Sequence, residues 1–133
     1  MLCKASKDHV LDAGSKGIRG HVGSDKTNPR DRITRYGEAV GFTAENISYV
    51  ERGALEIVMQ LYVDDGVKNR GHRANMINKN LRVVGIASGD HTKLDRITVF
   101  DYATDVKDPN KPDGKGGFEL QLAAFKAKTV EFA

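Results

Sequence analysis

The hydrophobic residues of the amino-terminal third predict two helices separated by a loop. Small and apolar residues recur at helical spacing from Leu2 to Ala13, which predicts a helix that ends at Gly14. Residues 14–28 contain four glycines among small polar residues, a pattern typical of an irregular loop. The pair Asn28-Pro29 then provides a cap and a suitable first residue for a second helix.

The middle of the chain predicts a strand followed by the most hydrophobic helix. Residues 45–50 alternate between polar and apolar side chains, as a half-buried strand does. Residues 54–65 are apolar on nearly every side of a helix, which predicts a central, buried one. Asp64 and Asp65 stand at its carboxyl end, where two carboxylates oppose the helix dipole. Such a local conflict often marks a functional position.

Two strands are predicted after a further short helical piece. Residues 71–77 suit a turn that leads into a short helix. Residues 82–88 and 96–103 are rich in Val and Ile, which predicts two antiparallel strands. Residues 88–91 supply the polar and glycine residues of a connecting turn.

A break in the pattern separates the carboxyl end from the rest of the chain. Residues 105–117 hold two prolines and three glycines, and we expect them to form a linker. The apolar residues beyond it fit a helix, which we favour, and their first members also fit a strand. The helical set is Phe118, Leu122, Phe125 and Thr129, and the alternating set is Phe118, Leu120 and Leu122.

Composition indicates one ordinary globular domain and excludes several classes of protein. The chain has 133 residues, 39% of them hydrophobic and 29% charged, and no apolar run is long enough for a transmembrane segment. The net charge of +3 is spread along the chain and aromatic residues are scarce, so we expect no nucleic-acid partner. One cysteine excludes an internal disulfide and a cysteine-based zinc cluster. Residues 1–10 show no apolar stretch, so no signal peptide is visible in this chain.

Four residues at the edges of predicted elements form the strongest chemical candidate: His21, Glu45, Asp64 and His72. Imidazole and carboxylate together suit zinc and similar divalent cations. Their separations match no compact metal motif, so the alternative is that each residue caps a helix or satisfies a loop. Two hydrolase pairs are weaker alternatives, because no Gly-x-Ser-x-Gly turn is present. They are Ser24 with His21 and Cys3 with His9.

A calcium loop is a further alternative within Asp108–Glu119. Asp, Asn and Glu stand at the first, third and twelfth positions, as in an EF-hand loop. However, Asp113 occupies the sixth position, where the sharp turn requires glycine. A solvated linker is therefore the simpler interpretation of this segment.

Several short motifs, taken in order, resemble the CAP superfamily, also called SCP-like, allergen V5/Tpx-1-related or pathogenesis-related-1-like domains. Residues 44–47, Ala-Glu-Asn-Ile, resemble its Gly-Glu-Asn-Ile signature. Residues 71–76, Gly-His-Arg-Ala-Asn-Met, resemble its Gly-His-Arg box. Residues 21–37 resemble the loop and helix before the signature, and the match extends over the closing strands, from Leu2 to Ala103.

The resemblance implies an α+β fold, a three-layer α-β-α sandwich with an antiparallel sheet that lacks the opening helix of the family. Residues 1–104 would form this domain, with residues 105–133 as a linker and a tail that packs on or beside it. The resemblance also implies a central cleft lined by two histidines and two acids. Residue by residue, these are His21, Glu45, His72 and Asp64, with Asp65 as the fallback for the second acid.

The resemblance implies a binding or signalling module rather than an enzyme, located in the extracellular space or the periplasm. Its cleft would take zinc or another divalent cation that folding does not require, and a lipid, sterol or other small ligand is a candidate partner. A homo-oligomer is also compatible with this class. The alternative is a metal-assisted hydrolase, a peptidase or esterase, that uses the same cleft.

The sequence departs from the family pattern at several positions. Ala44 replaces a glycine, and Asp64 is one methylene shorter than the usual glutamate. Absence of the opening helix would expose apolar sheet surface, which Phe118–Ala133 or a second subunit would then cover. Cys3 resembles one half of a disulfide whose partner position is near Ser88, so we expect a free thiol.

Overall fold

The computed structural model describes residues 1–111. The expected tail helix, and most of the loop considered for calcium, lie outside these described residues. Among the described residues, no helix is both long and apolar enough to cross a membrane. The elements in chain order are α1 (Leu2–Lys16), α2 (Pro29–Thr34), β1 (Glu38–Ser48), α3 (Ala54–Val63), α4 (Gly71–Ile77), β2 (Val83–His91) and β3 (Asp95–Lys107).

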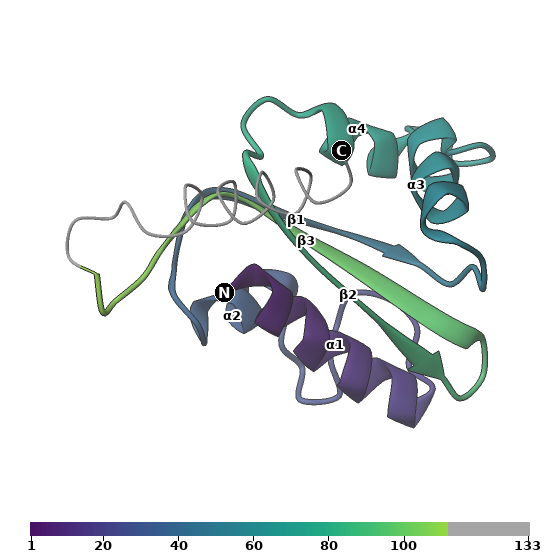
Figure 1. Ribbon diagram of the computed structural model, residues 1–133, viewed down its shortest axis with the longest axis horizontal. Helices are drawn as coiled ribbons and strands as arrows, with labels where there is room; N and C mark the ends of the chain where they lie inside the picture. Colours follow the sequence, from purple (N-terminus) through teal and green to yellow (C-terminus); the bar gives the residue numbers. More distant parts are fainter. Residues whose placement is uncertain (112–133) are drawn as a thin grey trace, which may run out of the picture.

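The described residues form a sheet between two layers of helices, which confirms the α-β-α sandwich (Figure 1). The strand order is β1-β3-β2, and both pairs are antiparallel. Helices α1 and α2 cover one face of the sheet, and α3 and α4 lie on the other (Figure 1). Because β3 is the central strand, its residues from Ile97 to Ala103 are buried on both faces.

Helix α1 continues one turn beyond its predicted end. Gly14 lies inside the helix, and Gly17, in the left-handed conformation with φ 62°, is the residue that ends it. Gly14 serves a different purpose, because a Cβ there would lie 2.2 Å from the carbonyl oxygen of Asp90. This glycine therefore lets α1 approach β2 closely, a constraint that the local sequence cannot reveal.

Helix α2 begins as predicted, with a complete capping box. The side chain of Asn28 accepts a hydrogen bond from the backbone N–H of Asp31 at 3.0 Å. In return, the Asp31 carboxylate accepts one from the backbone N–H of Asn28 at 2.9 Å. The two partners are three positions apart, so the capping box is visible in the sequence.

The prediction that α3 is buried on nearly all sides is wrong. Only Ile57 and Leu61 are buried, and they pack against Phe100 and Tyr102 of β3. Leu55, at 71% exposure, belongs to the outward side of the helix. Periodicity reports how apolar a helix is, whereas burial depends on how many neighbours the fold places around it.

The hairpin turn also differs from the prediction. Strand β2 extends to His91, so the chain turns three residues later than expected. A hydrogen bond of 2.8 Å between the hydroxyl oxygens of Ser88 and Thr98 joins the two strands before the turn. The Nδ1 of His91 accepts from the backbone N–H groups of Lys93 and Leu94, which closes the turn.

A polar layer divides the core on the α1 face of the sheet. One apolar cluster contains Leu2 and Ile33, and a second contains Val10 and Ile97. Between them lie buried polar or charged side chains from α1, α2, β1 and β3. They are Ser6, His9, Arg32, Glu45 and Asp101.

Candidate functional site

Glu45 and His21 form the first pair of the candidate site. The Glu45 carboxylate, only 1% exposed, has Oε1 2.7 Å from Nδ1 of His21. Its Oε2 accepts a hydrogen bond of 2.7 Å from the guanidinium of Arg32, which is also buried. Burial alone would raise the pKa of Glu45, but the hydrogen bond to His21 and the charge of Arg32 outweigh it and lower the pKa.

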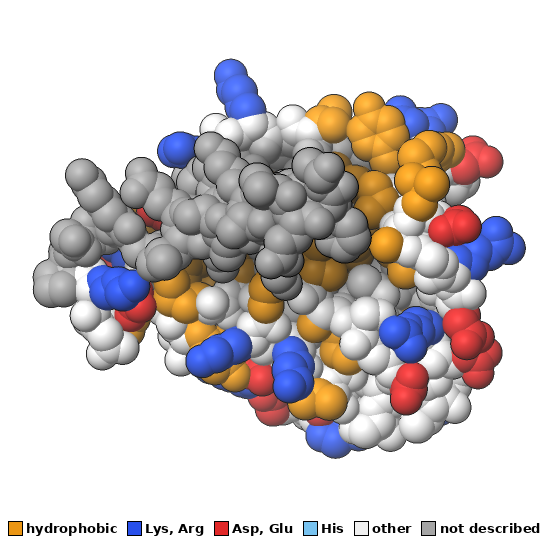
Figure 2. Space-filling view, in the orientation of Figure 1, with side chains coloured by type: hydrophobic (Ala, Val, Ile, Leu, Met, Phe, Trp, Pro, Cys, Tyr) orange, Lys and Arg blue, Asp and Glu red, His pale blue; other side chains and the backbone are white. Residues whose placement is uncertain are grey.

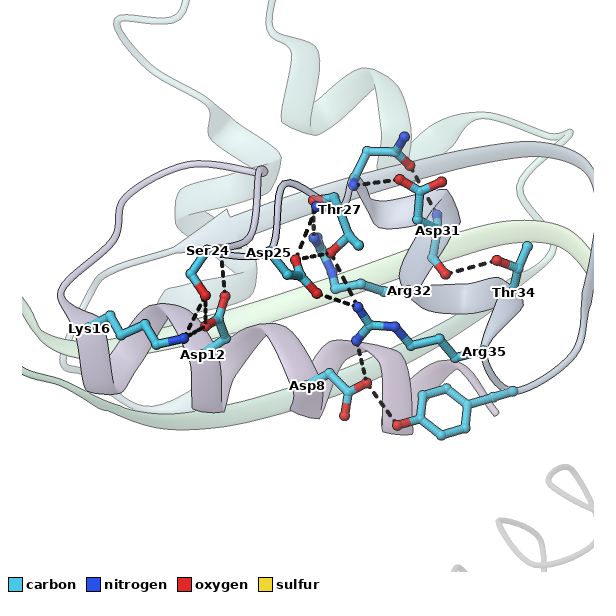
Figure 3. Close-up of polar contacts among 12 residues, drawn as sticks. Asp8, Asp12, Lys16, Ser24, Asp25, Thr27, Asp31, Arg32, Thr34 and Arg35 are labelled. Carbon is cyan, nitrogen blue, oxygen red and sulfur yellow. Dashed lines mark hydrogen bonds and ion pairs between the residues drawn. The ribbon is translucent and has the colours of Figure 1, made fainter.

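The loop that carries His21 is tied to both flanking helices (Figure 3). The carboxylate of Asp12 in α1 accepts hydrogen bonds from the backbone N–H and the hydroxyl of Ser24, at 2.7 and 2.6 Å. Asp25 accepts a hydrogen bond of 2.6 Å from Arg35, which follows α2. These contacts hold the loop backbone, while the side chain of His21 remains 52% exposed.

Asp64 and His72 form the second pair. Asp64 is the left-handed residue that ends α3, and its Oδ1 lies 2.8 Å from Nδ1 of His72. Its Oδ2 accepts from the backbone N–H groups of His72 and Arg73 in the first turn of α4, at 2.8 and 3.3 Å. The carboxylate that opposes the dipole of α3 therefore caps the positive start of α4, which resolves the predicted conflict.

The contacts of Asp64 also affect its ionisation, and they distinguish it from Asp65. Burial raises the pKa of Asp64, but the hydrogen bond to His72 and those from the α4 backbone hold the pKa below its ordinary value. Asp65 is exposed and accepts a hydrogen bond from the backbone N–H of Gly66. The structure thus places Asp64, and not the fallback Asp65, against His72.

Asn46 connects the two pairs through β1. It follows Glu45 in the strand, so its side chain points to the opposite face of the sheet. Its amide donates a hydrogen bond of 3.0 Å to the backbone carbonyl of His72 and accepts one of 2.8 Å from Asn75. Two consecutive residues of β1 thereby position one histidine each, a role of Asn46 that the sequence analysis missed.

The four candidate residues form two pairs rather than one four-ligand cluster. All four carboxylate oxygens of Glu45 and Asp64 already take part in hydrogen bonds. Among residues 1–111, no set of three or more His, Cys, Asp or Glu side chains is arranged to hold a metal ion. In the same part of the chain, nothing hydrogen-bonds to Nε2 of His21 or His72. The imidazoles are therefore the groups available to a ligand, and the acids orient them.

The alternative nucleophile pairs do not form. The hydroxyl of Ser24 donates to Asp12 rather than to His21. His9 is buried, and its Nε2 donates to the carbonyl of Gly20 at 2.8 Å, while Cys3 is exposed. Ser88 does not face Cys3. Its hydroxyl bonds to that of Thr98, and both side chains point to the face of the sheet opposite α1.

Asp101 is a buried acid behind Glu45 that the sequence analysis did not single out. It pairs with Glu45 across the two strands, and its Oδ2 accepts a hydrogen bond of 2.9 Å from Ser6. Burial and the negative charge of Glu45 raise the pKa of Asp101 to about 8. Asp101 is therefore protonated at neutral pH, and the polar layer keeps a single ionised acid beside Arg32.

Asp101→Asn is expected to weaken the dependence of stability on pH. The folded protein retains a proton on Asp101 up to a pKa of about 8, whereas the unfolded chain loses it near 3.8. The free energy of unfolding therefore falls as pH rises between these values, by up to about 1.4 kcal/mol per pH unit. Asparagine keeps an acceptor for the Ser6 hydroxyl and cannot ionise, so the variant should unfold at higher temperature than the parent at pH 8.

Thermal unfolding of both proteins from pH 5 to 9 measures this difference. Asp90→Asn is the matched control, because that side chain is 98% exposed on β2. A parent and an Asp101→Asn variant with parallel pH profiles would contradict the assignment of a raised pKa.

The fold and the two pairs together define a class of protein: an α-β-α sandwich with two partly exposed histidines, each beside a buried carboxylate. The chain belongs to the CAP family, the cysteine-rich secretory protein family, whose model matches residues 1–102. The motifs at residues 44–47 and 71–76, on which the expected resemblance depends, lie within this match.

A solved structure supports the fold independently. The chain is similar to an outer surface protein from Borrelia burgdorferi, with a TM-score of 0.63 and 20% sequence identity. The similarity covers 77% of this chain and 71% of that chain. No curated protein sequence matches the chain. At this identity the structural similarity establishes the CAP-like sandwich and nothing finer.

Proposed function

We propose that the chain is a non-enzymatic CAP binding module whose two imidazoles bind a divalent cation, zinc in the first instance. One observation carries the proposal: the Nδ1 of each of His21 and His72 is paired with a buried carboxylate, at 2.7 and 2.8 Å. An imidazole that donates its Nδ1 proton to a carboxylate presents the lone pair of Nε2, which is the usual arrangement behind a metal-bound histidine. His21 and His72 would hold the cation, and Glu45 and Asp64 would orient them.

A site with two protein ligands differs from a structural zinc centre. Structural sites enclose the metal with four protein ligands and contribute to folding. Here the hydrophobic clusters that hold the sheet and helices together contain neither histidine. We therefore propose an exchangeable cation that folding does not require.

The same contacts favour binding over metal-assisted hydrolysis. A general base needs a carboxylate oxygen that is free to accept a proton from water. Both oxygens of Glu45 and of Asp64 are already hydrogen-bonded, and the pKa of each acid is lowered. Neither acid is therefore suited to transfer protons. We also propose an extracellular or cell-surface location, which the family and the similarity to an outer surface protein support.

Zinc titration followed by calorimetry tests the proposed site. His21→Ala and His72→Ala are each expected to lower zinc affinity at least about 10-fold, and Asp64→Asn about 10- to 100-fold, because it loosens the imidazole. Asp65→Asn is the control, since its exposed side chain contacts neither histidine. Parent-like zinc affinity in both alanine variants would disprove the site, and zinc-dependent cleavage of a peptide or ester panel would favour the hydrolase.

A further inference from the structure

The outward side of α3 is an apolar stripe that the described residues leave largely exposed, although the guanidinium of Arg73 lies over the ring of Tyr62. Leu55, Met59 and Tyr62 are spaced four and three residues apart, so they lie along one side of the helix. Their exposed fractions are 71%, 46% and 46%. Figure 2 shows hydrophobic side chains gathered over this part of the molecule. We refer to these three residues as the α3 stripe.

An apolar groove lies next to α3, at the edge strand of the sheet. It has a volume of about 500 Å³, and its apolar lining includes Ile57 and Val58 of α3, Ile86 of β2 and Phe100 of β3. Ile86 is 47% exposed, and Val84, two residues before it on the same side of the strand, is 41% exposed. Apolar surface of this extent usually has a partner.

The end of the described chain places residues 118–133 within reach of this surface. Strand β3 ends at Lys107, four residues beyond Ala103, which pairs with the first residue of β2. Phe100 at the groove is seven positions before Lys107 in the strand, a distance of about 23 Å. The ten residues 108–117 span up to about 33 Å when extended, so a segment that follows them can return to the groove.

The sequence of residues 118–133 predicts an apolar helix side that is complementary to this apolar surface. Its four helically spaced residues, from Phe118 to Thr129, predict one apolar side. A helix of sixteen residues is about 24 Å long, which exceeds the length of α3. Val58 lines the groove, is 38% exposed, and lies on the α3 surface between the groove and the stripe, so one docked helix can contact both. We propose that residues 118–133 dock as a helix on the α3 stripe and the adjacent groove. Because the segment is tethered, its effective concentration is in the millimolar range, which favours it over a second copy at micromolar protein.

Because the chain has no tryptophan, Phe125→Trp introduces a single fluorescent reporter. In the docked segment its emission is expected to be blue-shifted relative to free tryptophan and independent of protein concentration. Ala127→Trp is the matched control, because residue 127 is on the opposite side of the predicted helix and should show solvent-exposed emission.

The receiving surface is tested in the Phe125→Trp background. Leu55→Asp is expected to shift the emission to that of exposed tryptophan, whereas Leu11→Asp, at an exposed leucine of α1, should leave it unchanged. Solvent-exposed emission without Leu55→Asp would overturn the proposal. A blue shift that appears only when light scattering detects a dimer would also overturn it, because the occupant would then be a second copy. Exposed emission together with a small apolar molecule extracted from the purified protein would overturn it as well, because that molecule would then occupy the groove. None of these outcomes bears on zinc binding, so this proposal and the proposed function fail independently.

Discussion

Replacing Arg32 with methionine is expected to lower the free energy of unfolding by about 3–5 kcal/mol. The guanidinium is 2% exposed and donates to the Glu45 carboxylate at 2.7 Å. It also donates to the backbone carbonyls of Thr27 and His21, at 3.0 and 3.1 Å. Methionine keeps much of the apolar volume but leaves a buried carboxylate without its cationic partner, and it releases the loop that carries His21. Denaturant unfolding followed by circular dichroism measures the loss.

Arg35→Met is the matched control for this change. Arg35 follows the same short helix, and its ion pairs with Asp8 and Asp25 are partly exposed. Exposed pairs contribute at most about 1 kcal/mol each, so this variant should remain close to the parent. Adding Glu45→Gln to Arg32→Met should restore part of the lost stability, because it removes the uncompensated charge. Equal stability losses in the two arginine variants would contradict the central role of the buried ion pair.

Gly85→Ala is expected to destabilise the protein by about 3 kcal/mol, because it overpacks the contact between β2 and α1. An added Cβ would lie 2.2 Å from the carbonyl carbon of Leu2 and 2.3 Å from the backbone nitrogen of Cys3. Backbone atoms cannot rotate away as a flexible side chain can, so α1 would have to move off the sheet. The hydroxyl of Ser6, now 3.0 Å from the carbonyl oxygen of Gly85, would lose this contact.

Gly71→Ala provides the comparison for Gly85→Ala. A Cβ at Gly71 would meet its nearest atom, in the side chain of Asn69, at 3.4 Å, an ordinary contact. Since Gly71 is the first residue of α4, alanine there should be neutral or stabilise the helix by up to about 1 kcal/mol. Comparable melting temperatures for the two variants, measured by scanning calorimetry, would show that α1 does not depend on the close approach at Gly85.

Features whose partners are close in sequence could be predicted. The capping box of α2 joins Asn28 to Asp31, and both residues are visible together in the chain. The strand and helix periods likewise predicted most of the helices and strands, because alternation and helical spacing are local properties, whereas the sandwich was expected from the resemblance to the CAP superfamily. Predictions that depended on distant partners were wrong: Gly14 does not end α1 but makes room for Asp90, and the hairpin turn is displaced beyond His91.

The candidate site, like the fold, was predicted only in part from the sequence. The residue types and the family motifs identified His21, Glu45, Asp64 and His72, but not how they are paired. Arg32 and Asp101 were missed as members of the network, although an acid within the apolar strand at residues 99–103 was a visible signal. The ionisation of Asp101 depends on burial and on Glu45, which the fold brings opposite it from 56 residues away in a neighbouring strand.

The sequence by itself determined the family, the order of helices and strands, and the chemical groups of the candidate site, because these depend on residue identity and short-range spacing. Only the tertiary structure decided that each carboxylate orients one imidazole, that Asp101 keeps its proton, and that α3 buries one side and exposes the other. These properties arise from distances, hydrogen bonds and desolvation between residues remote in the chain. They exist only after the sheet has brought those residues together.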